Sequence, residues 1–306
     1  MLTTAKPGMA STVHGIIHIY ADRRIAFEFT PSGNKNVLVF VGGLMDGLLT
    51  VPYLVPLAEE LGKIGYSLIQ IQISSSHTGW GVGSLSRDSD EIAMLINYLK
   101  SVKGGSRVKV GLMGHSTGCQ NTTHYFTRQP REDPAKFSTI DFGILQAPVS
   151  DRISGSESLP SEDFTESVKL AEKLIAAGEE TELMPSKYTK YFFNVPITAY
   201  RWNSLMGVRG DDDFFSDDLD ESDFETTFGK FDKPFLVLYS GADEYVPARV
   251  DKGSLMSKWA KAAGNYWSPH SKIVNGATHN IGPGSSETAE KEALDSIIAF
   301  INSYSL

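Results

Sequence analysis

Short apolar runs alternate with longer amphipathic segments along most of the chain. The runs are rich in β-branched and bulky residues and mostly free of charge, as is typical of strands buried on both faces of a parallel sheet. They cover residues 37–41, 68–73, 108–113, 142–146 and 234–239. The amphipathic segments repeat their apolar residues every three or four positions, which predicts helices over residues 53–65, 88–103 and 288–305. This alternation predicts an α/β fold, with a mostly parallel central sheet flanked by helices.

Two parts of the chain depart from this alternation. Residues 14–20 and 26–30 flank a polar turn, and this pattern predicts an antiparallel hairpin at the edge of the sheet. Residues 150–231 contain no strand pattern, and these roughly eighty residues are too many for a plain crossover between two strands. We expect this inserted segment, residues 150–231, to form a helical lid within a single domain that spans residues 1–306.

The inserted segment has three parts of different composition. Residues 164–177 have the apolar period of an amphipathic helix. An acidic run, residues 211–225, carries nine carboxylates, which is typical of a solvated loop and could attract a cationic substrate. The stretch between them is aromatic, and its rings, with Trp80, could either line a pocket or form the core of the lid. These side chains are Tyr188, Tyr191, Phe192, Phe193 and Trp202.

The strand expected over residues 108–113 leads directly into Gly114-His115-Ser116-Thr117-Gly118. Residues 119–128 then continue as a helix. A Gly-x-Ser-x-Gly motif between a strand and a helix is the nucleophile elbow of the α/β-hydrolase fold, whereas the same five residues elsewhere could be a chance turn. Glycines are needed on both sides because the turn is tight and a side chain there would collide with neighbouring elements. We therefore expect Ser116 to be a catalytic nucleophile.

A serine hydroxyl needs a base to remove its proton, and in this fold the base is a histidine late in the chain. His279 lies in a loop after the last expected strand, residues 271–274, and before the final helix. His270 stands at the start of that strand, which is the wrong end for a catalytic group. We therefore expect His279 to be the base.

The acid of the triad should follow the strand at residues 234–239, between the serine and the histidine. Asp243 occupies this position, and its carboxylate would accept a hydrogen bond from the proton-bearing nitrogen of His279. Glu244 is adjacent and could take the same role. The sequence favours Asp243 and leaves Glu244 as the alternative.

Two backbone N–H groups should stabilise the oxyanion of the tetrahedral intermediate. One belongs to the residue after the nucleophile, Thr117, and the other to the loop after an early strand. That loop, which we call the oxyanion loop, reads Gly42-Gly43-Leu44-Met45-Asp46-Gly47. Its position predicts Leu44 as the second donor, with Met45 as the alternative.

No cofactor or metal ion is expected for this chemistry, because acyl transfer by a serine needs only side chains, backbone N–H groups and water. His14 and His18 lie on one face of the first expected strand, where two ligands could hold a metal ion. No third ligand accompanies them, and we expect no metal site there.

Charge and composition exclude several classes of partner. The formal net charge is -9 and the isoelectric point is about 5.3, which argues against nucleic acid and anionic membranes. Residues 1–10 lack the apolar core of a signal peptide, and no apolar run is long enough to span a bilayer. The single cysteine, Cys119, allows no intrachain disulfide. We expect a soluble, cytoplasmic protein whose oligomeric state the sequence leaves open.

Three motifs together point to one small family. They are the oxyanion loop, the sequence Ser74-Ser75-Ser76-His77-Thr78-Gly79-Trp80-Gly81, and the elbow extended as Gly114-His115-Ser116-Thr117-Gly118-Cys119-Gln120. In these motifs the chain resembles the fungal α/β-hydrolases long catalogued as a domain of unknown function. That family includes siderophore esterases that act on fusarinine-type compounds. The resemblance covers most of the chain and is weakest in the inserted segment.

The resemblance implies an intracellular esterase with a small-molecule substrate. It would open the ester bonds of a cyclic, hydroxyornithine-based siderophore so that iron is released, and any iron would belong to the substrate. Ser116, Asp243 and His279 carry over as catalytic residues because each matches its motif. The substrate itself is less secure, since family members can differ in what they cleave.

Two other functions remain compatible with the sequence. The first is a general carboxylesterase, lipase-like enzyme or thioesterase, because fold alone does not determine the substrate. The second is a non-catalytic binding protein on a hydrolase scaffold. Such proteins generally lose a triad member, whereas Ser116, Asp243 and His279 are all present in the expected order.

Overall fold

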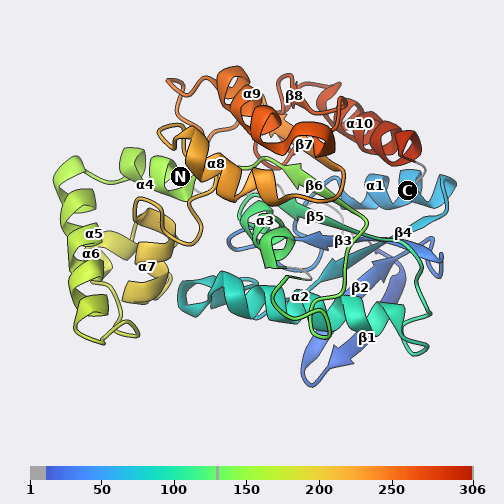
Figure 1. Ribbon diagram of the computed structural model, residues 1–306, viewed down its shortest axis with the longest axis horizontal. Coiled ribbons are helices and arrows are strands. Elements are labelled where there is room, and N and C mark those ends of the chain that lie inside the picture. The colour runs from blue at the N-terminus through green and yellow to red at the C-terminus, as the bar shows by residue number, and fades with distance from the viewer. Residues whose placement is uncertain (1–11, 129–130, 305–306) are drawn as a thin grey trace.

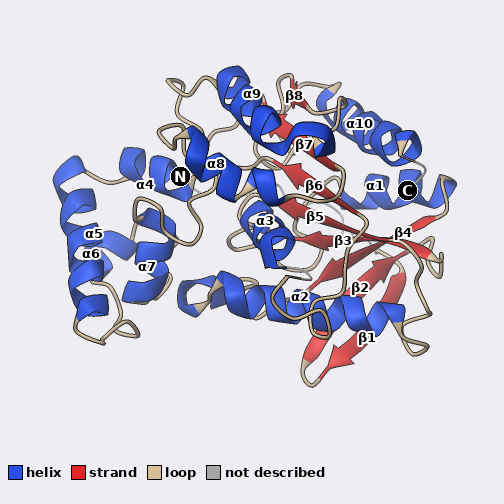
Figure 2. Ribbon diagram, viewed as in Figure 1, coloured by secondary structure: helices blue, strands red, loops and turns tan. Residues whose placement is uncertain are grey.

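A computed structural model describes residues 12–128 and 131–304, and within these ranges the strands form one eight-stranded sheet. Its order is β1-β2-β4-β3-β5-β6-β7-β8 (Figures 1 and 2). The strands are β1 (Gly15–Ala21), β2 (Arg24–Phe29), β3 (Asn36–Val41), β4 (Tyr66–Ile71), β5 (Val110–His115), β6 (Phe142–Gln146), β7 (Phe235–Ser240) and β8 (Lys272–Val274). Residues 1–10, examined above for a signal peptide, lie outside the described residues.

The direction of the strands agrees with the sequence expectation. β1 and β2 pair antiparallel at the edge of the sheet, and β2 also runs antiparallel to β4. Every other pair, from β4 through β3, β5, β6 and β7 to β8, is parallel. The hairpin and the mostly parallel α/β sheet predicted from the hydrophobic pattern are therefore confirmed.

Helices cover both faces of the sheet (Figure 2). The helices in the described ranges are α1 (Leu54–Lys63), α2 (Leu85–Lys100), α3 (Gly118–Arg128), α4 (Asp151–Ser158), α5 (Ser161–Ala176), α6 (Ser186–Thr189), α7 (Ala199–Met206), α8 (Glu221–Thr226), α9 (Lys252–Ala263) and α10 (Ala289–Ser303). In the described ranges no helix is both long and apolar enough to cross a membrane.

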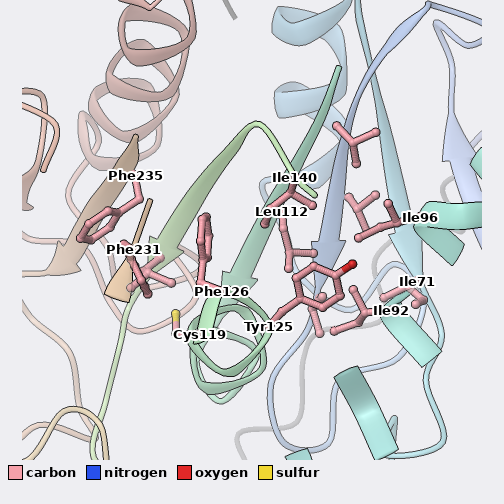
Figure 3. Close-up of a cluster of buried hydrophobic side chains, with 14 of the residues drawn as sticks. Ile71, Ile92, Ile96, Leu112, Cys119, Tyr125, Phe126, Ile140, Phe231 and Phe235 are labelled. Carbon is pink, nitrogen blue, oxygen red and sulfur yellow. The ribbon is translucent and has the colours of Figure 1, made fainter. Parts of the chain in front are cut away.

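Two apolar layers explain why the strand sequences are continuously apolar. Along β3, Val37, Val39 and Val41 point into the layer formed with α2, α3 and α9, whereas Leu38 and Phe40 point into the layer with α1 and α10. Figure 3 shows part of the first layer, where Phe126 of α3 lies near Leu112 of β5. Both faces of the strand are buried, so neither can be polar.

Some element boundaries differ from the sequence expectation. β5 was expected to end at Met113 but continues to His115, because the first two residues of the elbow still pair with β6. α2 begins three residues early, at Leu85, where the side chain of Ser84 accepts the backbone N–H of Arg87 and caps the helix. α9 was not expected, since its period is broken by polar residues, although Leu255, Met256 and Trp259 are buried.

The inserted segment, residues 150–231, is helical from α4 to α8. Figure 1 shows α4, α5, α6 and α7 grouped at one end of the sheet. They enclose a small core of their own that includes Trp202, Tyr188 and Ala171. The end of the segment is different, because Phe215, Phe224 and other aromatic rings there are buried in the main core beside α9.

The acidic run, residues 211–225, differs from the expected solvated loop. Asp212 is buried and forms an ion pair with Arg201 at 2.5 Å. Asp213 is also buried and pairs with Arg152 at 2.9 Å. More exposed carboxylates in the run pair with Arg152, Arg209, Arg249 or Lys261. Much of the negative charge that the sequence suggested for substrate attraction is therefore balanced within the protein.

Candidate active site

Ser116 stands at the turn between β5 and α3, with a positive φ of 55°. The flanking glycines make this turn possible. A Cβ atom on Gly114 would lie 2.0 Å from the carbonyl oxygen of Gly118, and one on Gly118 would lie 2.2 Å from the carbonyl oxygen of Val41. Such separations are far below van der Waals contact, so only glycine fits at either position. The turn leaves the Ser116 side chain partly exposed beyond the end of the strand.

The side chains of Asp243 and His279 meet beyond the ends of β7 and β8. Nδ1 of His279 lies 2.8 Å from Oδ2 of Asp243, and the carboxylate is almost fully buried. Oδ1 of Asp243 accepts the backbone N–H of Tyr245 at 3.0 Å. In this arrangement the imidazole donates its Nδ1–H to Asp243, which leaves Nε2 free to accept a proton.

Glu244, the alternative acid, contacts the same histidine at a different atom. Its carboxylate accepts the backbone N–H of His279 at 2.9 Å. It therefore holds the loop rather than the ring. His270, the other late histidine, bonds instead to the hydroxyl of Ser303 on α10.

Ser116 and His279 line one cavity of about 220 Å³. The aromatic side chains of the inserted segment divide between the two roles considered from sequence. Tyr191, Phe192 and Phe193 line this cavity. Tyr188 and Trp202 are buried in the core of the helical insertion, and Trp80 joins them there. Both interpretations therefore hold, and Phe192 serves both, because it lines the cavity and its ring packs edge-on against Trp202.

The oxyanion loop lies against the nucleophile. Oδ2 of Asp46 accepts the backbone N–H of Gly43 at 2.7 Å, which holds the turn of the loop. Leu44 lines the cavity, and both Leu44 and Met45 pack against the core of the insertion. Among residues 12–128 and 131–304, no protein acceptor pairs with the backbone N–H of Leu44 or of Thr117. Neither group therefore has a protein partner among the described residues that a ligand oxygen would have to displace.

A polar network behind the site connects its parts. Nδ1 of His115 lies 2.6 Å from Oε1 of Gln146, and Nε2 of Gln146 donates to the carbonyl oxygen of His279 at 3.1 Å. The rings of His115 and His279 have their centroids 4.9 Å apart. Burial and the neighbouring His279 lower the pKa of His115 to about 4. His115 is therefore uncharged at neutral pH and adds no positive charge beside the base.

The two histidines considered as metal ligands have other surroundings. Nε2 of His18 lies 2.8 Å from Oε2 of Glu28, and its Nδ1 lies 3.2 Å from the hydroxyl of Tyr98. His14 is exposed. In the described part of the chain, no three His, Cys, Asp or Glu residues are arranged to hold a metal ion.

Comparison with known proteins places this architecture in a family. A family model described as "Protein of unknown function (DUF1749)" matches residues 4–302. The chain belongs to this family. The resemblance drawn from the sequence motifs is thereby confirmed, and so is the α/β-hydrolase fold, which solved structures of similar proteins share over nearly the whole chain.

Three similar proteins bear on the chemistry of this DUF1749 member. A UPF0613 protein of Schizosaccharomyces pombe is 37% identical, over 97% of this chain and 99% of the relative. The fusarinine C esterase sidJ of Aspergillus fumigatus is 35% identical, over 87% of this chain and 89% of the relative. The solved structure of the siderophore hydrolase EstB from Aspergillus fumigatus has a TM-score of 0.83 and 31% identity, covering 97% of this chain and 99% of its own.

Two residues of this DUF1749 protein were missed from sequence although they lie at the site. Gln146 is the polar last residue of the apolar strand β6, and that position at the end of a parallel strand was the available signal. Asp151 lines the cavity from the first turn of α4. No local pattern distinguished it from the many other carboxylates of the inserted segment.

Proposed function

We propose that this protein is a serine esterase that hydrolyses the ester bonds of fusarinine-type siderophores, with Ser116 as the nucleophile and His279 as its base. One observation carries the catalytic part: Ser116 opens onto the same cavity as an imidazole whose Nδ1 contacts a buried carboxylate. The relatives named as an esterase and a siderophore hydrolase, together with the α/β-hydrolase fold, make the protein a carboxylic ester hydrolase.

The reaction begins with acylation. Ser116 attacks the ester carbonyl carbon while Nε2 of His279 takes the hydroxyl proton. Asp243 accepts the Nδ1–H of the imidazolium and stabilises its charge. The backbone N–H groups of Leu44 and Thr117 donate to the oxyanion. The bond between the carbonyl carbon and the alcohol oxygen then breaks, and the alcohol leaves with the proton from His279.

Deacylation repeats these steps with water. His279 takes a proton from water, the resulting hydroxide attacks the acyl-enzyme carbonyl, and the bond to Ser116 Oγ breaks as the serine regains a proton. The carboxylic acid is released. Each proton that His279 accepts is returned within the same half-reaction, so the enzyme ends in its starting state.

The substrate assignment rests on the relatives. A fusarinine C esterase and a siderophore hydrolase both resemble this chain over most of their length. We assign the same class of substrate here, a hydroxyornithine-based siderophore with or without iron, cleaved in the cytoplasm to release the metal. We assign the helices α4 to α7 as the lid, because the aromatic loop after α6 lines the cavity.

The test compares wild type with Ser116→Ala and with Ser257→Ala, a matched control on an exposed face of α9. Mass spectrometry follows cleavage of a fusarinine-type siderophore, and a fluorophosphonate probe reports an activated serine. We expect linear hydroxyornithine fragments and labelling from wild type and Ser257→Ala, and kcat lower by on the order of a million-fold in Ser116→Ala.

Other outcomes separate the alternatives. Labelling of Ser116 without siderophore cleavage would support a serine hydrolase but reject the siderophore as its substrate. Short acyl esters and thioesters would then be tested as substrates. Absence of both labelling and cleavage would favour a binding protein on a hydrolase scaffold.

A further inference from the structure

One face of α4 forms a polar wall of the cavity that contains Ser116. Asp151, Ser154 and Ser158 are spaced three and four residues apart, so they lie on the same face of the helix. All three line the cavity. Aromatic side chains from the loop after α6 line the same cavity, and this wall is one place where polar groups of a bound molecule can form hydrogen bonds.

Among the described residues, Asp151 has one side-chain hydrogen-bond partner, Gln120, and this partner determines which carboxyl oxygen accepts a hydrogen bond. The amide nitrogen of Gln120 donates to the carbonyl oxygen of Val149 at 3.0 Å and to Oδ2 of Asp151 at 2.8 Å. Both amide hydrogens of Gln120 are therefore used, and Oδ2 of Asp151 must accept one of them. Oδ1 of Asp151 is left for a different partner.

No lysine or arginine in the described ranges forms an ion pair with Asp151. Arg201, whose charge acts on Asp151, pairs with Asp212, and the next residue in the chain, Arg152, pairs with Asp213. Asp151 is half-buried at the cavity wall, and a carboxylate that loses part of its hydration without gaining a cationic partner is shifted toward its neutral form.

The carboxylates around Asp151 act in the same direction as burial. Burial, followed by the charge of Asp212, raises the pKa of Asp151 to about 8, with Asp213 adding to this and Arg201 opposing it. Gln120, on α3, is uncharged. The other titratable groups that line the cavity are Asp46, His115, Tyr191, Glu244, Tyr245 and His279. Asp151 is therefore mostly protonated at pH 7, and a protonated carboxyl group donates a hydrogen bond.

We propose that Asp151 is a specificity-determining residue that donates a hydrogen bond to a neutral carbonyl oxygen, such as that of an amide, in the ester bound at Ser116. Ser154 and Ser158 continue the same polar wall away from Asp151. This inference rests on the proposed serine esterase but not on the identity of its natural substrate. It favours esters that carry amide-type carbonyl groups over plain alkyl esters, and over esters with an ammonium group at the same position.

The experiment uses matched synthetic esters and three variants. One series of esters carries an amide carbonyl one to four bonds from the scissile group, a second carries methylene there, and a third carries a primary ammonium. Asp151→Asn keeps the acceptor for Gln120 and presents an N–H donor to the cavity, but it cannot ionise. Asp151→Ala removes the donor. Glu162→Gln, an exposed acid in the first turn of α5, is the matched control.

At pH 7 we expect wild type, Asp151→Asn and Glu162→Gln to prefer the best amide ester to its methylene analogue in kcat/KM. In Asp151→Ala we expect this preference to fall by about 10- to 100-fold, the range for losing one buried hydrogen bond. The preference of wild type should also decrease as the pH rises through about 8, because the donor proton is lost. In Asp151→Asn the preference should stay constant over the same pH range, because the amide cannot ionise. This comparison tests the inference even if Asp151→Ala fails to fold.

Two outcomes would overturn the inference while leaving the esterase intact. Preference of wild type for the ammonium ester, lost in Asp151→Asn, would show that an ionised carboxylate binds a cation. Equal preferences and equal pH profiles in wild type, Asp151→Asn and Asp151→Ala would make Asp151 purely structural. Absence of any Ser116-dependent ester cleavage would instead remove the proposed function, and this inference with it.

Discussion

The backbone of Gly43 lies directly against the side chain of Ser116. A Cβ atom on Gly43 would sit 2.5 Å from Cβ and 2.9 Å from Oγ of the serine. In Gly43→Ala the oxyanion loop or the nucleophile must therefore move. Misplacing one oxyanion donor typically costs about 100- to 1000-fold in rate, and we expect kcat/KM on a short acyl ester to fall by at least about 100-fold.

The control for this substitution is Gly253→Ala in the first turn of α9, where the nearest atom to an added Cβ lies 3.4 Å away. Activity should be unchanged there, and the helix should gain stability, by roughly 0.5–1 kcal/mol. Full activity in Gly43→Ala would show that the loop has room to adjust and that its position does not limit catalysis.

The adjacent carboxylates Asp243 and Glu244 should differ sharply in their effect on catalysis. Asp243 contacts the imidazole of His279, whereas Glu244 contacts only its backbone. We expect Asp243→Asn to lower kcat by on the order of 10⁴-fold, because the amide favours the wrong tautomer of the ring. Glu244→Gln keeps an oxygen that can accept the backbone N–H and should change kcat only slightly. Steady-state kinetics of both variants test this assignment. A larger loss of kcat in Glu244→Gln than in Asp243→Asn would reverse it.

Two arginines of the inserted segment should differ in their effect on stability. Arg201 is buried, pairs with Asp212 and donates to the carbonyl oxygen of Trp80 at 3.1 Å. In Arg201→Met, Asp212 becomes a buried charge without its partner, and we expect the free energy of unfolding to fall by about 3–5 kcal/mol.

Arg209 is the matched control, because it is exposed and pairs with the carboxylates of Asp220 and Asp223 at the surface. Exposed ion pairs contribute little to stability, so Arg209→Met should unfold at nearly the wild-type urea concentration. Similar midpoints for Arg201→Met and Arg209→Met would mean that the buried pair does not stabilise the segment.

The pH dependence of stability should report on Glu28, which does not line the cavity. Burial alone would raise the pKa of Glu28, but it is lowered to about 2 by His18, Gly33, Ser67 and Arg107. Because the pKa is lower in the folded state, this contribution is complete above about pH 4.5 and is lost as the pH falls toward 2.

We therefore expect Glu28→Gln to lower the urea midpoint of unfolding at pH 7. Between pH 4.5 and pH 2 the midpoint should then decrease less in Glu28→Gln than in wild type. Glu60→Gln, which alters an exposed pair with Lys63, should keep the wild-type profile. An unchanged profile in Glu28→Gln would assign the acid sensitivity to other groups.

Some features of the fold follow from patterns within a few residues of one another. β6 begins and ends where the apolar run predicted, because a strand buried on both faces has no polar position except at its ends. The end of β5 was missed by two residues, since pairing with β6 continues into the elbow. Helix α9 was missed because only one narrow side of it is buried.

The sequence by itself determined the alternation of strands and helices, the glycines around Ser116 and the order of the serine, aspartate and histidine. These features are local, since a steric clash at Gly114 or an apolar period depends on near neighbours in the chain. Only the tertiary structure decided which carboxylate contacts the ring of His279, which aromatic rings line the cavity and which arginines form ion pairs with the acidic run. Asp243 and His279 are 36 residues apart, and Asp151 and Gln120 are 31 apart. Contacts over such separations depend on how the helices and strands pack, and no short pattern in the chain records that packing.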